Sequence, residues 1–385
     1  MATIHYSLSG EGRGHAARAQ VLVDLLSPRH RMVLHAYGAA LEMLAPLYKG
    51  TDIEVRAIEG MRFRYDKSGT LNRPASLLAA VPFLSKMPAR ARRLARQLEK
   101  DRADLVIADF EPLMPRAAEL AQVPVMSVDH QQFLTCYDLS SLPASLRRKA
   151  EFLAPFVRPY YKRLVRAVIS AFFFPPLKRR GHPITQAGVL LRKEILQARP
   201  EEGAHLVAYV RREAPERILS ALSECGRPVR VYGHGQHAAS GNLTFHPINP
   251  QAFAEDLATS TALVTTAGNQ VVGEALSLRK PVLSYPEPGN FEQHINGHFL
   301  KESGQGWSRD AETFDAKLVK SFLSQCPQLR DRIRPERLNG NRAALAAVEY
   351  EIRAATDSCA IRSDPGFSAR GQTPLRLGQL SPRKS

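Results

Sequence analysis

Two glycine-containing turns carry the residues of this 385-residue chain that could do chemistry. The first, residues 9–15 (SGEGRGH), follows a short apolar run and opens a helical pattern, so its backbone N–H groups are free to meet a polar ligand. It contains Gly12 and Gly14 and ends in His15. A histidine has an ordinary pKa near neutrality and can take a proton from a hydroxyl group. His15 is therefore the first candidate for a general base, with a structural histidine in a tight turn as the alternative.

Carboxylates at two strand ends could orient this histidine and stabilise its charged form. Asp109 follows the apolar run 105–108, and Asp129 and His130 follow the run 125–128. Parallel strands bring their carboxyl ends to one edge of a sheet, so both groups are candidates for the same cleft. Asp109 could equally cap the helix that begins after it.

The second turn, residues 266–269 (TAGN), lies between a buried strand and a helix that starts near Gln270. A helix N-terminus offers free N–H groups and a favourable dipole to a diphosphate, and Gly268 and Asn269 stand at that end. Gly268 also lets the backbone approach closely because it has no Cβ. Glu274, one turn further on, could accept both hydroxyls of a ribose.

Further polar residues follow in the same half of the chain. After Lys280-Pro281 comes another buried strand, and a proline-containing loop, 286–291, then leads to Glu292 and Gln293 at the start of a helix, where sugar hydroxyls could be bound. Earlier, Arg211 or Arg212 follows a strand and could neutralise phosphates. Both arginines could equally be surface residues.

Short β-rich runs alternate with amphipathic stretches throughout, which predicts βαβ units and mostly parallel sheets. The fold class is therefore α/β, with two Rossmann-like domains in tandem and a cleft between them. The expected strands are 4–8, 32–36, 53–57, 105–108, 125–128, 205–210, 229–232, 243–246, 262–265 and 282–285. We place the domains at 1–180 and 181–355, and expect the tail 356–385, rich in Pro, Gly, Ser and Arg, to be disordered.

The composition limits the classes of protein and partner. Four cysteines without a paired spacing argue against a disulfide framework and a structural zinc site, which fits a reducing, cytoplasmic compartment. We find no signal peptide, and no apolar run long enough to span a bilayer. The net charge of +16 calls for an anionic partner: nucleic acid, anionic lipid or a phosphorylated substrate.

A basic and aromatic segment, residues 142–181, separates the two halves. It holds ten Lys or Arg against one acid, interleaved with phenylalanines and tyrosines. A second basic group lies on the helical pattern 88–100. Such a mixture suits an anionic membrane surface, and ordinary solvated faces explain it equally well. Nucleic-acid binding is the less favoured partner, because no RNA-binding or helix-turn-helix motif is present.

The order of features in the second half resembles a known donor site. It runs from Gly268 through Glu274, Lys280-Pro281 and a proline-containing loop to Glu292-Gln293 and Asn296. This order resembles the donor-site signature of GT-B glycosyltransferases, the group around the peptidoglycan N-acetylglucosaminyltransferase and the teichoic-acid-biosynthesis-like branch. The glycine turn before His15 resembles the acceptor loop of the same group, and the resemblance covers most of residues 1–350.

The resemblance implies an inverting, metal-independent transferase without a cofactor, whose donor is a nucleotide-sugar, first of all a UDP-sugar. The acceptor would be a lipid-linked or cell-envelope glycan reached from the inner face of the membrane. The chain departs from the group at residues 209–213 (YVRRE), where relatives near the peptidoglycan enzyme carry a glycine- and serine-rich loop. A nucleotide-sugar 2-epimerase of the same fold, or a non-catalytic scaffold that binds anionic lipid or RNA, are the alternatives.

Overall fold

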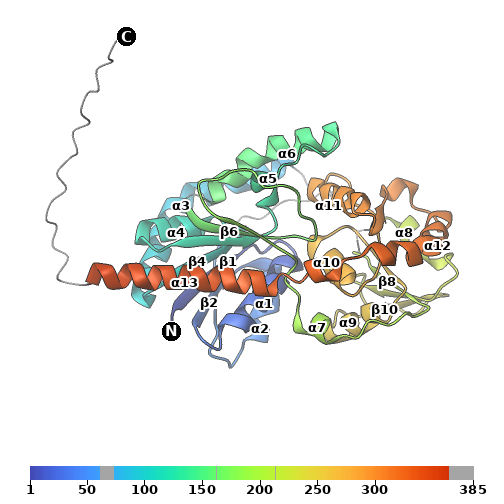
Figure 1. Cartoon of the computed structure of the whole chain (residues 1–385), viewed down its shortest axis with the longest axis horizontal. Helices are drawn as coiled ribbons and strands as arrows, with labels where there is room; N and C mark the ends of the chain where they lie inside the picture. Colours follow the sequence, from blue (N-terminus) through green and yellow to red (C-terminus); the bar gives the residue numbers. More distant parts are fainter. Residues whose placement is uncertain (61–72, 162, 213, 364–385) are drawn as a thin grey trace, which may run out of the picture.

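The computed structural model describes residues 1–60, 73–161, 163–212 and 214–363. Two lobes lie side by side, each built on a parallel sheet covered by helices, and the last helix crosses back to the first lobe (Figure 1). No helix in these ranges is both long enough and apolar enough to cross a membrane. The predicted α/β class with two Rossmann-like domains is confirmed.

The sheet of the first lobe contains seven described strands in the order β3-β2-β1-β4-β5-β6-β7, and every pairing is parallel. Its inner strands are buried on both faces, so they appear in the sequence as nearly continuous apolar runs. The strands are β1 (Thr3–Leu8), β2 (Arg31–Ala36), β3 (Glu54–Ala57), β4 (Leu105–Asp109), β5 (Val125–Asp129), β6 (Leu164–Ser170) and β7 (Ile184–Ala187).

Helices cover both faces of this sheet. They are α1 (Arg13–Leu26), α2 (Gly38–Leu47), α3 (Arg73–Asp101), α4 (Leu113–Ala121), α5 (Phe133–Cys136), α6 (Ala144–Val157) and the 3-10 turn η1 (Arg158–Tyr160). One core lies under α1 and α2, and a second lies under α3 and α4. The strands β1, β4 and β5 are parallel neighbours, so the loops after their carboxyl ends lie together at one edge of the sheet, where a functional site can form.

The sheet of the second lobe has six strands among the described residues, all parallel, in the order β10-β9-β8-β11-β12-β13. They are β8 (Leu206–Tyr209), β9 (Val229–Tyr232), β10 (Leu243–His246), β11 (Ala262–Thr265), β12 (Val282–Ser284) and β13 (Gly306–Ser308). The helices are α7 (Lys193–Gln197), α8 (Glu216–Ser223), α9 (Pro250–Ala258), α10 (Asn269–Ser277), α11 (Phe291–Glu302), η2 (Ala311–Thr313), α12 (Ala316–Arg332), η3 (Pro335–Arg337) and α13 (Asn341–Ser363).

The chain crosses between the lobes twice, at neighbouring points. The outward crossing passes Gly188 and the return crossing passes Gly340, whose N–H donates to the carbonyl of Val189 at 2.9 Å. A Cβ on Gly188 would lie 2.2 Å from the carbonyl oxygen of Leu338, so the two crossings can touch only without a side chain there. After the return, α13 packs against β6, β7 and α1 of the first lobe.

The predicted domain limits need correction at two points. Residue 180 falls between β6 and β7, which pair with each other in the first sheet, so the outward crossing comes later, after β7. The first lobe also includes α13, far from it in sequence. Residues 356–363, expected to be disordered, form the end of α13, whereas 364–385 lie outside the described residues.

Candidate functional site

Two helix N-termini converge where the carboxyl edges of the two sheets meet. Helix α1 begins after Gly12 and α10 begins after Gly268, and neither of these N-cap residues has a side chain to cap the helix. A Cβ built on Gly14 would lie 4.0 Å from the Cβ of Gln270, so the first turns of the two helices are neighbours. Uncapped N–H groups from both lobes therefore favour an anion at this place.

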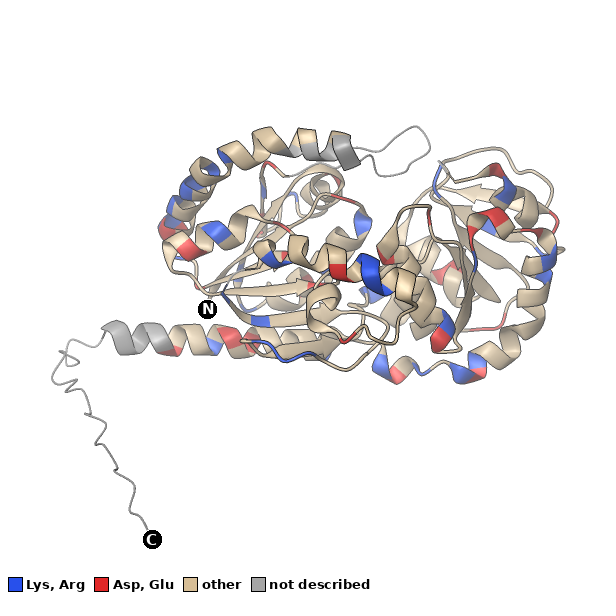
Figure 2. Ribbon diagram, turned by 90° about the horizontal axis from the view of Figure 1, so that it is seen from above, with Lys and Arg blue, Asp and Glu red and all other residues tan. Residues whose placement is uncertain are grey.

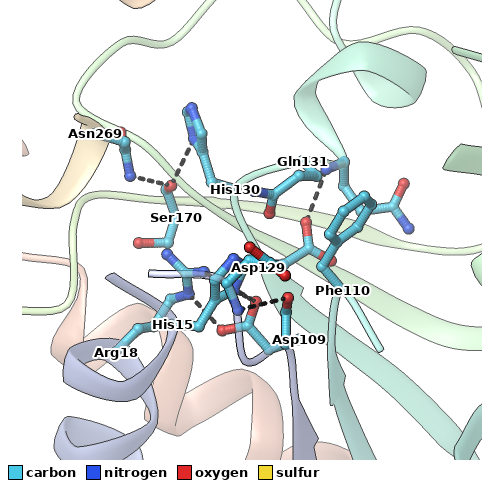
Figure 3. Close-up of polar contacts among 12 residues, drawn as sticks. His15, Arg18, Asp109, Phe110, Asp129, His130, Gln131, Ser170 and Asn269 are labelled. Carbon is cyan, nitrogen blue, oxygen red and sulfur yellow. Dashed lines mark hydrogen bonds and ion pairs between the residues drawn. The ribbon is translucent and has the colours of Figure 1, made fainter. Parts of the chain in front are cut away.

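His15, Arg18 and Asp109 form a buried cluster on the side of the first lobe (Figure 3). The Nδ1 atom of His15 lies 2.7 Å from Oδ1 of Asp109. Arg18, one turn along α1, donates from Nε to Oδ2 and from Nη2 to Oδ1 of the same carboxylate, each at 2.9 Å. The structure thus brings together His15 and Asp109, the two predicted catalytic residues.

The charge of Asp109 decides which nitrogen of His15 carries the proton. Burial alone would raise the pKa of Asp109, but the Arg18 guanidinium and His15 outweigh it and hold this pKa below its ordinary value. An ionised carboxylate can only accept, so Nδ1 of His15 donates to it. Nε2 then keeps its lone pair, as a general base requires.

An aromatic wall stands beside His15. The Phe110 ring lies parallel to the His15 ring, with centroids 6.5 Å apart, and stacks on Tyr160 at 4.7 Å. Phe110 has a φ of 52°, a left-handed value that costs energy in a non-glycine residue, and its N–H donates to the hydroxyl of Tyr161 at 2.7 Å. The strained residue directly after Asp109 therefore holds an aromatic stack beside His15.

Two further carboxyls near Asp109 are fully buried. Glu111 caps α4, accepting the N–H groups of Leu113 and Met114 at 2.7 and 2.9 Å, so the capping role considered for Asp109 belongs to Glu111. Asp129 accepts the N–H of Gln132 at 2.7 Å. Burial raises the pKa of Asp129 to about 7, and the neighbouring Asp109 charge adds to the rise. Asp129 does not contact His15 through any hydrogen bond between described residues, which leaves Asp109 as the partner.

His130 faces the second lobe. Its Nε2 lies 3.0 Å from Oδ1 of Asn296 in α11, and its Nδ1 lies 3.1 Å from the carbonyl oxygen of Ser170. Burial lowers the pKa of His130, although Glu292 counteracts it. Both partners accept, so a neutral ring donates to one of them at a time. Because His130 is 1% exposed, the expected acceptor contact is not available to it in this arrangement.

The turn before α10 is also tied to the first lobe. Asn269 donates from Nδ2 to the carbonyl oxygen of Ser170 at 3.0 Å and accepts the N–H of Phe172 at 3.3 Å. Ala267 has a φ of 67°, and its carbonyl accepts from Nδ2 of Asn296 at 3.0 Å. The side chain of Asn269 is therefore occupied, whereas the N–H groups of the first turn of α10 stay free for a ligand.

Glu274 lies deeper than expected. It is 2% exposed, and its two oxygens accept from Nε and Nη2 of Arg192 at 2.9 and 2.8 Å. Gln270 donates to the same carboxylate at 2.9 Å. A ribose could reach Glu274 only after the Arg192 pair opens, so the ribose contact stays a prediction. Arg192 belongs to the segment that joins the lobes, and no local sequence pattern marks it as a partner of Glu274.

The other predicted donor residues surround the loop between β12 and α11. Gln293 is buried and folds this loop, since its Oε1 accepts the N–H of Glu287 at 2.7 Å and its Nε2 donates to the Glu287 carboxylate at 3.0 Å. Glu292 is partly exposed and accepts from Gln131 of the first lobe at 3.3 Å. Arg211 is half-exposed and pairs with Glu287 at 3.3 Å. Glu292 and Arg211 can therefore still reach a ligand, and Gln293 supports the loop.

Comparison with known proteins assigns the chain to a family. The model of glycosyl transferase family 1 matches residues 2–327. The chain belongs to this family. An uncharacterised glycosyltransferase of Methanosarcina acetivorans is 24% identical to this glycosyltransferase over 324 residues, which cover 78% of this chain and 83% of the relative.

Solved glycosyltransferases share the fold at low sequence identity. Phytolacca americana UGT2, complexed with UDP-2-fluoroglucose and pterostilbene, superposes with a TM-score of 0.61 at 12% identity, over 92% of this chain and 100% of that one. MurG of Acinetobacter baumannii superposes with a TM-score of 0.56 at 14% identity, over 91% of this chain and 100% of that one. The two-lobe arrangement of this glycosyltransferase is the GT-B fold.

Among the described residues of this glycosyltransferase, no three His, Cys, Asp or Glu side chains lie close enough together to form a metal-binding group. Arg13, the first residue of α1, is exposed, and two further guanidinium groups near the converging helices are those of Arg18 and Arg192. Arg18 and Arg192 are each paired with a buried carboxylate. A ligand's negative charge could therefore be met by backbone N–H groups, by the exposed Arg13 and by the half-exposed Arg211.

Proposed function

We propose that this glycosyltransferase moves a sugar from a nucleotide-sugar, with a UDP-sugar as first candidate, to an acceptor hydroxyl and inverts the anomeric carbon. The observation that carries the proposal is the buried contact of 2.7 Å between His15 and Asp109, beside the converging N-termini of α1 and α10. A base next to an anion site is what displacement of a diphosphate by a hydroxyl requires.

The chemistry follows from the cluster. The Nε2 atom of His15 takes the proton of the acceptor hydroxyl as its oxygen attacks the anomeric carbon, and the bond from that carbon to the diphosphate oxygen breaks. Attack from the face opposite the leaving group inverts the configuration. Asp109 keeps Nδ1–H in place and stabilises the imidazolium that forms. No step in this scheme needs a metal ion.

The donor would lie on the second lobe. Its diphosphate fits the first turn of α10 at Gly268 and Asn269, and Arg211 would turn from Glu287 toward the leaving phosphate. Glu274 would accept the ribose hydroxyls in exchange for Arg192, and Glu292 would bind the sugar. The UDP-sugar analogue in the complex of Phytolacca americana UGT2 supports a UDP-linked donor for this chain.

The acceptor would enter beside Gly12, Gly14 and Phe110 on the first lobe. We place this lobe against an anionic membrane surface, with a lipid-linked or cell-envelope glycan as acceptor. Helix α6 exposes 62% of Phe152 and 61% of Phe156, and the same helix carries Arg147, Arg148 and Lys149 against the single acid Glu151 (Figure 2 colours the charged residues of the whole chain). Because α6 packs on α11 of the second lobe, a membrane bound there would lie close to the cleft.

Thermal-shift titration with a panel of nucleotide-sugars tests the donor, because a ligand that binds the folded state raises its melting temperature. The donor found is then incubated with acceptors, and NMR reads the anomeric configuration of the product. The proposal predicts an inverted glycoside, release of the nucleoside diphosphate, and activity that survives EDTA. A changed sugar still attached to its nucleotide would identify an epimerase, and neither binding nor turnover would identify a scaffold.

A further inference from the structure

A circuit of close contacts among three buried side chains and two backbone carbonyls joins the lobes behind the proposed donor site. The imidazole of His130 lies against the carbonyl oxygen of Ser170, which accepts from Nδ2 of Asn269. Asn296 donates from Nδ2 to the carbonyl of Ala267, and its Oδ1 lies against Nε2 of His130. The backbone from Ala267 to Asn269 completes the circuit. The four contacts measure 3.0 to 3.1 Å. Their members are between 0 and 5% exposed (Figure 3 shows the part around His130 and Asn269).

The circuit holds the turn 267–269 in a conformation that it would not keep alone. Ala267 adopts a left-handed φ of 67°, which is unfavourable in a residue with a Cβ. Asn296 holds the carbonyl of Ala267, and Asn269, two residues later, is anchored to Ser170. The direction of the first N–H groups of α10 therefore depends on contacts that reach into the other lobe.

His130 is the member that closes the circuit from the first lobe. The amide of Asn296 has a fixed orientation, because its Nδ2 donates to Ala267 and leaves Oδ1 for His130. Without the imidazole, Asn296 keeps one buried partner fewer and is free to rotate. A buried polar group without a partner is unfavourable, and this favours rotation of the Asn296 amide.

We propose that His130 and Asn296 are positioning residues for the donor, which hold the turn 267–269 so that the N-terminus of α10 faces the diphosphate. Affinity for the donor then depends on a histidine of the acceptor lobe. The identity of the ligand rests on the proposed function, whereas the positioning of the turn 267–269 is independent of which ligand binds.

Hydrogen exchange tests the positioning without any ligand. The first intrahelical bond of α10 runs from the N–H of Val272 to the carbonyl of Gly268, at 3.1 Å. In His130→Ala and in Asn296→Ala, the peptide spanning 268–277 should exchange about tenfold faster, the equivalent of one buried hydrogen bond. The matched control is Gln131→Ala, which removes another contact between the lobes, to Glu292, and should leave this peptide unchanged.

Titration with UDP tests the consequence for the donor. His130→Ala and Asn296→Ala should weaken UDP binding about tenfold, and Gln131→Ala should have little effect. His130→Gln keeps one side-chain donor and should recover part of the affinity, which a general loss of stability would not reproduce. If a variant fails to fold, the remaining one of the pair gives the same comparison.

Unchanged exchange in both variants would overturn the proposal. So would a rise in the acceptor KM with unchanged UDP affinity, because His130 would then bind the acceptor. If UDP does not bind the wild-type protein, the proposed donor fails, and the exchange experiment still decides whether the circuit holds the turn.

Discussion

Both oxygens of the buried Glu274 carboxylate accept hydrogen bonds from Arg192, at 2.9 and 2.8 Å. This pair links α10 to the segment that crosses between the lobes. It occupies the carboxylate that the donor ribose would need. Two predictions separate its structural role from its role in binding.

Arg192→Met should lower the free energy of unfolding by about 3–5 kcal/mol, because it leaves a buried carboxylate without its partner. Urea denaturation measures the loss. The double variant Arg192→Met, Glu274→Met removes both charges and should recover much of the stability. If the double variant instead loses as much free energy of unfolding as the two single variants together, the two side chains do not stabilise each other.

Glu274→Gln should weaken UDP binding about tenfold, since an amide cannot accept both ribose hydroxyls as a carboxylate does. Calorimetric titration gives the affinity. Inorganic pyrophosphate, which has no ribose, is the matched ligand and should bind the variant as it binds the wild type. Equal UDP affinity in the two proteins would remove Glu274 from the donor site.

Asp129→Asn should change how stability depends on pH. Burial raises the pKa of Asp129 to about 7, so the folded protein holds a proton that the unfolded chain releases near pH 4. The wild type should therefore lose stability relative to the variant as the pH rises from about 4 to about 7, by roughly 2–4 kcal/mol in total. Chemical denaturation at several pH values measures this difference.

The amide in Asp129→Asn still accepts the N–H of Gln132, so the comparison isolates the charge. Glu42→Gln, which removes an exposed carboxyl, is the control and should give a flat difference. A flat difference for Asp129→Asn as well would mean that this carboxyl ionises normally.

The double variant Phe152→Ser, Phe156→Ser should reduce binding to anionic liposomes at least tenfold. Each exposed ring contributes about 1.5–3 kcal/mol to binding when its apolar surface is buried in the membrane interface. Reversal of Arg147, Arg148 and Lys149 to Glu should have a similar effect, since each basic residue contributes about 1 kcal/mol near anionic lipid. Sedimentation measures the bound fraction.

Leu196→Ser provides the control for the liposome assay, because Leu196 is a half-exposed apolar residue on α7 of the second lobe. Its binding should match that of the wild type. Unchanged sedimentation of the α6 variants would show that this helix is an ordinary solvated surface.

The sequence predicted those parts of the fold that depend on local patterns. All ten expected strands form. The inner ones are buried on both faces and appear as apolar runs, whereas the edge strand β3 is partly exposed. Strands β6, β7 and β13 were not expected. In β6, Arg166 interrupts the apolar pattern, and the structure pairs Arg166 with Glu351 of α13 at 2.7 Å. That partner lies 185 residues away, so no local pattern could reveal it.

The site was predicted where it depends on glycine turns and strand ends. His15 and Asp109 were predicted from these patterns, and the structure brings their side chains into contact. Arg18 was not, although an arginine on the buried side of α1, three residues after His15, was a usable signal. Arg192 and the left-handed Phe110 depend on tertiary contacts, which the sequence does not display.

The most direct test of the account is the turnover of His15→Gln, measured as release of the nucleoside diphosphate from the donor and acceptor pair found for the wild type. His182→Gln, before the amino end of β7, is the control. We predict that kcat of His15→Gln falls about 10²–10⁴-fold while its UDP affinity stays within about threefold of the wild type. A kcat close to that of the wild type would contradict the role of His15 as the general base.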